Sequence, residues 1–162
     1  MSRVLIVVAA ALALSPATAL AAPPRHGVLV PGRSLGGIRL GDSEAAVEAR
    51  WGKSHGTCTS CPRPTWYFTY KAFTQQGVGV EFEAGRVVAI YTLWQPVGWR
   101  TASGVALGMP KWRLPQLAPQ QCRGYLALST YDRKAGAATV YFVLAGRIWG
   151  FALQRPREPL CR

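Results

Sequence analysis

The residues with the clearest chemical potential are four cysteines, two of which stand in a C-x-x-C pattern. Cys58 and Cys61 are separated by two residues, and Cys122 and Cys161 follow much later. C-x-x-C spacing occurs in thiol–disulfide exchange sites, where the first cysteine is activated at a helix N-terminus, and in zinc sites. A small structural disulfide has the same spacing.

The context of the C-x-x-C pattern favours the structural disulfide. Prolines at positions 62 and 64 follow it directly, where a redox site would have a helix, and a zinc site would need two further ligands. The N-terminal residues, described below, predict export, and an even number of cysteines in an exported protein favours disulfides. Of the three possible pairings we favour Cys58–Cys61 and Cys122–Cys161. A thiol–disulfide exchange protein and a metal site remain alternatives.

Aromatic side chains are the second candidate for function. The sequence contains six Trp and six Tyr, and Trp51, Trp66 and Phe68 are expected to fill the core. Other aromatics occupy both alternating positions of their predicted strands, so one core cannot easily bury all of them. These are Tyr67, Tyr91, Tyr141 and Trp149. We expect them on a protein-binding surface, since such surfaces are rich in Tyr and Trp. Simple filling of space by large side chains is the alternative.

The remaining polar residues do not form a recognisable catalytic set. The only histidines are His26, in a predicted leader, and His55, in a predicted solvent-facing loop. Glu81 and Glu83 are two apart on a predicted strand, so both point to one face, which we interpret as exposed. We therefore predict a protein that is not an enzyme, with no cofactor and no metal site.

The sequence motifs of the elements that position these residues occur twice in the chain. Gly37-Ile38-Arg39-Leu40-Gly41 returns as Gly104-Val105-Ala106-Leu107-Gly108, and Gly85-Arg86-Val87 returns as Gly146-Arg147-Ile148. Such self-similarity indicates tandem copies of one small unit. The glycines fit neither a nucleotide-binding fingerprint nor a P-loop, so we interpret them as structural turns.

Each copy is predicted to be one helix followed by three antiparallel strands. The first helix follows an N-cap at Asp42 and covers 45–51. In the second, over 109–114, Pro110 fits the first helical turn and Pro115 ends the helix almost at once, so it is expected to be shorter and weaker. Alternating or aromatic runs predict strands at 66–70, 78–83, 86–93, 125–131, 139–144 and 147–153. Two such units joined at their edges predict an α+β fold, with one continuous sheet and both helices on one face.

The N-terminal residues resemble a secretory signal peptide. A short basic start, an apolar run and the sequence Ala19-Leu20-Ala21 predict cleavage after Ala21. A flexible leader over 22–33, repeat one over 34–94, a linker over 95–100 and repeat two over 101–162 are expected to follow. Both repeats would form one compact domain, located outside the cell, in the periplasm or in the cell envelope. No later stretch is long enough to span a membrane.

The charge of the chain limits its partners. The formal net charge is +12, and loss of the signal peptide, which contains only Arg3, leaves +11. The basic residues are spread out and match no nucleic-acid-binding motif, so we expect no nucleic acid partner. A soluble, well-solvated surface is one interpretation. Attraction to an anionic partner, namely a cell-wall polymer, phospholipid headgroups or an acidic protein, is another.

The glycine motif and strands resemble a known family. The motif over 37–42, followed by Val47, Trp51-Gly52, Phe82 and Gly85-Arg86-Val87, resembles the β-lactamase-inhibitor-protein fold. Its repeat unit is shared by the SmpA/OmlA-type outer-membrane assembly lipoproteins. The resemblance covers about residues 34–153 and implies a tandem-repeat fold with a concave sheet that binds other proteins.

The resemblance adds one residue to the candidate surface. Inhibitory members bind through loops between strands, which correspond here to 71–77 and 133–137, and Phe73 is the aromatic residue in them. The predicted function is therefore a secreted, non-enzymatic module that docks an envelope or extracellular protein on its concave sheet face. The first alternative is a basic structural protein bound to cell-wall polymers; the second is the thiol–disulfide protein.

Overall fold

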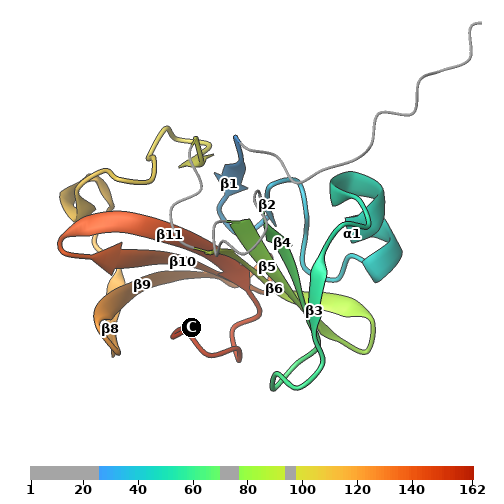
Figure 1. The fold of residues 1–162 in the computed structure, drawn as a ribbon. Coiled ribbons are helices and arrows are strands. Elements are labelled where there is room, and N and C mark those ends of the chain that lie inside the picture. Colours follow the sequence, from blue (N-terminus) through green and yellow to red (C-terminus); the bar gives the residue numbers. More distant parts are fainter. Residues whose placement is uncertain (1–25, 70–76, 94–97) are drawn as a thin grey trace, which may run out of the picture.

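The computed structural model of the chain describes residues 26–69, 77–93 and 98–162, and this part is mostly β-structure. The described residues form an eight-stranded sheet, a three-stranded sheet, one α-helix and one short 3-10 turn. In Figure 1 the helix and the small sheet lie on one side of the large sheet, and the C-terminus lies on the other.

The predicted α+β class, with a helix in each half, is therefore wrong. The helix of the first half, α1 (Glu44–Trp51), begins after Ser43, whose hydroxyl accepts a hydrogen bond from the Ala46 amide. Its counterpart in the second half is only the 3-10 turn η1 (Lys111–Arg113). Pro110 offers no capping side chain, and Leu114 is extended because it precedes Pro115. The second helix is therefore limited to one 3-10 turn between the two prolines.

The large sheet consists of two four-stranded antiparallel meanders that meet edge to edge. Its order is β3-β4-β5-β6-β11-β10-β9-β8, and β6 pairs with β11 at the centre. In this order the strands are β3 (Gly56–Cys58), β4 (Thr65–Thr69), β5 (Gly77–Glu83), β6 (Arg86–Leu93), β11 (Arg147–Gln154), β10 (Ala137–Leu144), β9 (Tyr125–Asp132) and β8 (Ala118–Cys122).

The small sheet closes over one face of the large one. It contains β2 (Ser34–Leu35), β1 (Val28–Val30) and β7 (Arg100–Thr101), in that order. Leu29 at its centre is completely buried. Residues 28–30, which the sequence assigned to a flexible leader, are thus a strand that covers the core.

The main core lies between the large sheet and the elements that cover it. It includes Leu29, Ile38, Val47, Trp51 and Phe68, all essentially inaccessible to solvent. Further members come from the inward positions of the central strands, and are Val78, Val80, Phe82, Ile90, Phe151 and Leu153. The burial of this apolar surface is the dominant stabilising term of the fold.

The two glycine motifs make matching contacts. Gly37 and Gly41 have φ of 83°, and Gly104 and Gly108 have φ of 87° and 85°, a region that favours glycine. The Gly41 amide donates to the Val87 carbonyl at 2.8 Å, and the Gly108 amide donates to the corresponding carbonyl at position 148 at 2.6 Å. Each motif is therefore a structural turn that fixes the start of the last strand of its half.

One β-bulge in each half decides which side chains reach the second face of the sheet. The register of β5 against β6 shifts between Glu81 and Phe82, which leaves Val88 as an extra residue. The register of β10 against β11 shifts after Phe142, which leaves Trp149 as an extra residue. A bulge reverses the alternation of side chains along its strand.

Candidate functional site

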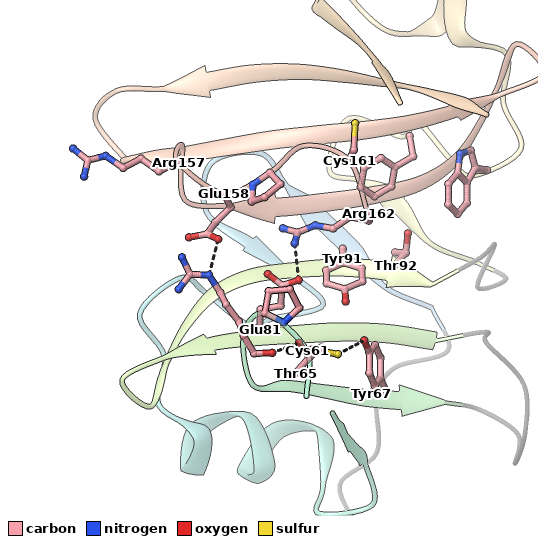
Figure 2. A pocket seen from close by; sticks show the side chains of 15 residues that line it. Cys61, Thr65, Tyr67, Glu81, Tyr91, Thr92, Arg157, Glu158, Cys161 and Arg162 are labelled. Carbon is pink, nitrogen blue, oxygen red and sulfur yellow. Dashed lines mark hydrogen bonds and ion pairs between the residues drawn. The ribbon is translucent and has the colours of Figure 1, made fainter. Parts of the chain in front are cut away.

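The second face of the large sheet, opposite the main core, carries an open cavity of about 920 Å³. Aromatic residues from four strands line it, namely Tyr67, Tyr91, Phe142 and Trp149. The C-terminal tail, residues 155–162, folds back to form the opposite wall. Figure 2 shows tail residues on one side of the cavity and residues of β4, β5 and β6 on the other.

Two glycines make room for aromatic rings on this face. Gly79 pairs with Tyr91 across β5 and β6, and a Cβ atom at position 79 would lie 2.5 Å from the Tyr91 ring. Gly150 pairs with Phe142 across β10 and β11, and a Cβ atom there would lie 2.8 Å from the Phe142 ring. The rings therefore lie over the glycine backbone, and the cavity keeps its depth.

Aromatic rings in the second half form a contiguous cluster. The Tyr125 ring lies 5.7 Å from the Phe142 ring and 5.6 Å from the Trp149 ring, both edge to face. Phe142 and Trp149 are themselves 5.6 Å apart. Phe142 is buried, whereas Tyr125 and Trp149 are half-exposed. Rigid, partly accessible rings of this kind are typical anchors for a bound partner.

A nearly buried ion pair fixes the tail over the sheet. Arg162 Nη1 lies 2.5 Å from Glu81 Oε1, and these side chains are only 14% and 12% exposed. The guanidinium also lies 4.9 Å from the centre of the Tyr91 ring and donates to Gln154 Oε1 at 2.9 Å. Glu81, interpreted from the sequence as an exposed strand residue, is instead the anchor of the tail.

A second group of charges lies at the rim of the cavity. Arg63 donates from Nε to Glu158 at 2.9 Å and from Nη1 to Glu83, which also pairs with Arg155 at 2.8 Å. The hydrogen bond from Arg63 is the largest cause that lowers the pKa of Glu83, and the same bond raises the pKa of Arg63. The charged groups at this rim thus hold the tail to the β4–β5 side.

The predicted disulfides are confirmed, and both lie beside the cavity. Cys58–Cys61 closes the loop between β3 and β4, and Cys122–Cys161 joins β8 to the tail across 39 residues. Among the described residues there is no free cysteine. The C-x-x-C pair begins at the last residue of β3 and does not begin a helix, unlike the redox sites considered from the sequence.

The structure brings together three of the predicted partner-binding residues. Tyr67, Tyr91 and Trp149 line the cavity. Tyr141 lies in the main core instead, edge to face with Phe151 at 5.8 Å. Phe73 lies outside the described residues. Alternation along the strands could not separate Tyr141 from the others, because the bulges were not visible in the sequence.

Several residues of the site were missed by sequence reasoning. Phe142, Tyr125, Glu81 and Arg162 were not assigned to it. The glycines offered one signal: Gly79 and Gly150, each inside an apolar strand pattern, mark a close approach by another group. The sequence of the tail has no hydrophobic periodicity that predicts its position. The tail is held in place by the Cys122–Cys161 disulfide and by its ion pairs.

Burial changes the acidity of two tyrosines. Burial is the main cause that raises the pKa of Tyr91, and a hydrogen bond with Tyr67 adds to it. Burial alone raises the pKa of Tyr141. Both hydroxyls therefore lose their proton at a higher pH than an ordinary tyrosine does.

The histidine of the first half is packed against the helix. His55 stacks on Trp66 with ring centres 4.0 Å apart, and its Nε2 lies 3.6 Å from Glu48 Oε1. Its side chain is only 11% exposed, so the loop does not present it to solvent as the sequence suggested. This residue lies on the core side of the sheet, away from the cavity.

The described ranges hold neither a cluster of metal ligands nor a membrane-spanning helix. No cluster of three or more His, Cys, Asp or Glu side chains there is arranged to hold a metal ion. None of the helices there is long and apolar enough to cross a bilayer.

Comparisons with known proteins give one structural likeness. No family model and no curated protein matches the sequence. The crystal structure of the uncharacterized protein YfeY from Escherichia coli is similar with a TM-score of 0.48 and 12% sequence identity, over 85% of this chain and 99% of that one. This likeness carries no argument about function, and the resemblance to the inhibitor family stays a prediction.

Proposed function

We propose that the protein is a secreted, non-enzymatic binding module that holds an envelope or extracellular protein at the cavity on the second face of its sheet. The observation that carries this proposal is an open cavity of about 920 Å³ floored by aromatic rings and bordered by ion pairs. Protein-binding hot spots have the same arrangement, with Tyr, Trp and Arg at the centre.

The geometry suits the insertion of an apolar side chain from a partner. Tyr67 and Trp149 are half-buried, so their rings still have surface to cover, while Tyr91 and Phe142 beneath them are buried and immobilised by packing. Preorganised rings lose little entropy when a partner binds. Arg63 and the tail charges then supply polar contacts around the rim.

Exchange of one tryptophan tests the proposal. Trp149→Ala removes a cavity wall and should abolish capture of the partner from the native secretome, measured by quantitative mass spectrometry. Trp149→Phe keeps a ring and should retain most of the capture. Trp112→Ala is the matched control, because Trp112 is 70% exposed and is not part of the cavity lining.

The outcome is decisive only for folded variants. Near-ultraviolet circular dichroism of each variant shows whether the aromatic packing survives. Equal capture by wild type and a folded Trp149→Ala variant would refute the cavity as the binding site. A loss of capture shared by Trp112→Ala would refute it as well.

A further inference from the structure

Three loops of the second half meet at one end of the large sheet. The 3-10 turn η1 touches the β10–β11 turn through a hydrogen bond from the Lys111 amide to the Gly146 carbonyl at 2.8 Å. Lys111, Gly124 and Gly146 all line one hollow of about 200 Å³, so the β8–β9 turn joins the group. We call residues 111–113, 123–124 and 144–147 the basic tip.

Two large apolar side chains of the basic tip face solvent. Trp112 is 70% exposed, and Leu144 is 47% exposed. Among the described residues, four large apolar side chains are exposed, and Trp112 and Leu144 are two of them. Both side chains therefore offer apolar surface that an outside partner can cover.

All charged residues of the basic tip are positive. Lys111, Arg113, Arg123 and Arg147 are exposed, and the Arg113 guanidinium lies 4.7 Å above the Trp112 ring. None of the seven acidic residues of the chain falls within the basic tip. Trp112 therefore has one cation directly over its ring, and the segments of the basic tip hold three more cations and no carboxylate.

The matching end of the first half does not share this uniform positive charge. After the first glycine motif the chain continues with Asp42, Ser43 and Glu44, where the second half has Met109, Pro110 and the basic turn. The β5–β6 turn begins with Glu83 where the β10–β11 turn begins with Leu144. The same backbone frame thus carries acidic residues mixed with Arg39 and Arg86 in the first half, and only basic charges beside an exposed tryptophan in the second.

We propose that the basic tip docks on a membrane surface rich in anionic phospholipid. Tryptophan favours the interface between headgroups and acyl chains, and Leu144 adds apolar surface at the same tip. Lys and Arg beside such residues are attracted to anionic headgroups. An anionic wall polymer would use the cations but leave Trp112 and Leu144 uncovered, so a lipid surface fits the tip better.

Vesicle flotation tests the proposal on protein purified after export, so that every variant has the same N-terminus. The protein should bind vesicles of phosphatidylglycerol and phosphatidylcholine but not vesicles of phosphatidylcholine alone. Each Lys or Arg near an anionic surface contributes about fivefold to partitioning, so Lys111→Gln with Arg113→Gln should lower binding about 25-fold. Trp112→Ala should lower it about tenfold.

A matched double variant controls for net charge. Arg39→Gln with Lys53→Gln removes the same charge from exposed residues of the first half and should leave binding within about threefold of wild type. On vesicle binding, the blue shift of tryptophan emission should disappear in Trp112→Phe. This inference is independent of the proposed cavity function, because Trp149→Ala should still bind vesicles.

Three results would overturn the inference. Equal losses in the two double variants would mean that net charge alone drives binding. An unchanged blue shift in Trp112→Phe would show that this ring does not enter the interface. Absence of vesicle binding together with salt-sensitive sedimentation with purified anionic wall polymer would assign the basic tip to the polymer.

Discussion

At the scale of single residues, glycine determines the depth of the cavity. Gly79 lies between Tyr67 and Tyr91 in the register of β4, β5 and β6, and the absence of a side chain lets the Tyr91 ring lie on the strand. Gly150 has the same relation to Phe142 in the second half. A glycine normally weakens the strand that contains it. Here the packing of an aromatic ring over the glycine offsets that loss of stability.

Gly79→Ala tests this role. The new Cβ would meet the Tyr91 ring at 2.5 Å, and overpacking of this kind lowers the free energy of unfolding by about 1–3 kcal/mol. Chemical denaturation measures the change. Gly56→Ala is the control, because its Cβ would meet nothing closer than 4.0 Å. A Gly79→Ala variant as stable as Gly56→Ala would contradict the packing described for Tyr91.

The buried tyrosine hydroxyls predict a pH dependence. Tyr91 and Tyr141 have raised pKa values in the folded state, whereas in the unfolded chain they ionise near 10.0. Their contribution to stability is therefore complete below pH 10 and is lost as the pH rises above it. Absorbance titration should show these two tyrosines ionising only as the protein unfolds, and Tyr91→Phe and Tyr141→Phe should each reduce that delayed fraction. Complete ionisation of all tyrosines near pH 10 in the folded protein would contradict the burial described for Tyr91 and Tyr141.

At the scale of elements, the C-terminal tail forms one wall of the cavity and is held there by a disulfide and by an ion pair. The Cys122–Cys161 disulfide fixes it covalently, and the Arg162–Glu81 pair fixes its direction. Nearly buried ion pairs add less stability than their attraction suggests, because both groups give up hydration. The disulfide should therefore contribute most of the stabilisation, while the ion pair sets the geometry of the cavity.

The two disulfides should differ in their effect on stability. Loop-closure entropy gives about 4 kcal/mol for the 39-residue separation of Cys122–Cys161 and about 2 kcal/mol for the 3-residue separation of Cys58–Cys61. Denaturation of Cys122→Ser/Cys161→Ser and of Cys58→Ser/Cys61→Ser compares them. Equal losses, or a larger loss for the short loop, would show that the tail is not anchored as described.

The N-terminal cap of helix α1 can also be tested. Ser43 accepts from the Ala46 amide at 3.2 Å, so Ser43→Ala should lower the free energy of unfolding by about 1 kcal/mol. The adjacent Asp42, which the sequence predicted as the cap, instead accepts from the Arg39 amide at 2.9 Å. Far-ultraviolet circular dichroism measures the helix content of each variant. A greater loss of helix content in Asp42→Ala than in Ser43→Ala would contradict this assignment.

At the scale of the whole molecule, the sequence was informative where its pattern reflects local packing. The strand predicted over 86–93 matches β6, and the runs in the second half closely match β9, β10 and β11, because alternation and β-branched residues act within one strand. The disulfide pairing also followed from position. The binding face could not be predicted in full, since the faces of Tyr91 and Trp149 depend on the one β-bulge in each half.

The errors share a physical origin in long-range contacts. The strand β8 contains Pro119 and two glutamines, and only its place at the sheet edge beside β9 makes it a strand. The predicted second helix failed because two prolines enclose it, although the halves are otherwise alike. The leader became β1 because Leu29 fills a space in the core that local sequence does not reveal.

The central claim is that the cavity face of the sheet holds a protein partner, and site-specific photocrosslinking tests it most directly. A benzoylphenylalanine side chain placed at Tyr67, on the cavity, should give one discrete crosslinked product when the protein is irradiated in its native secretome. The same group at Trp112, on the basic tip, should not give that product. An equal product from both positions, or none from position 67 in folded protein, would contradict the account.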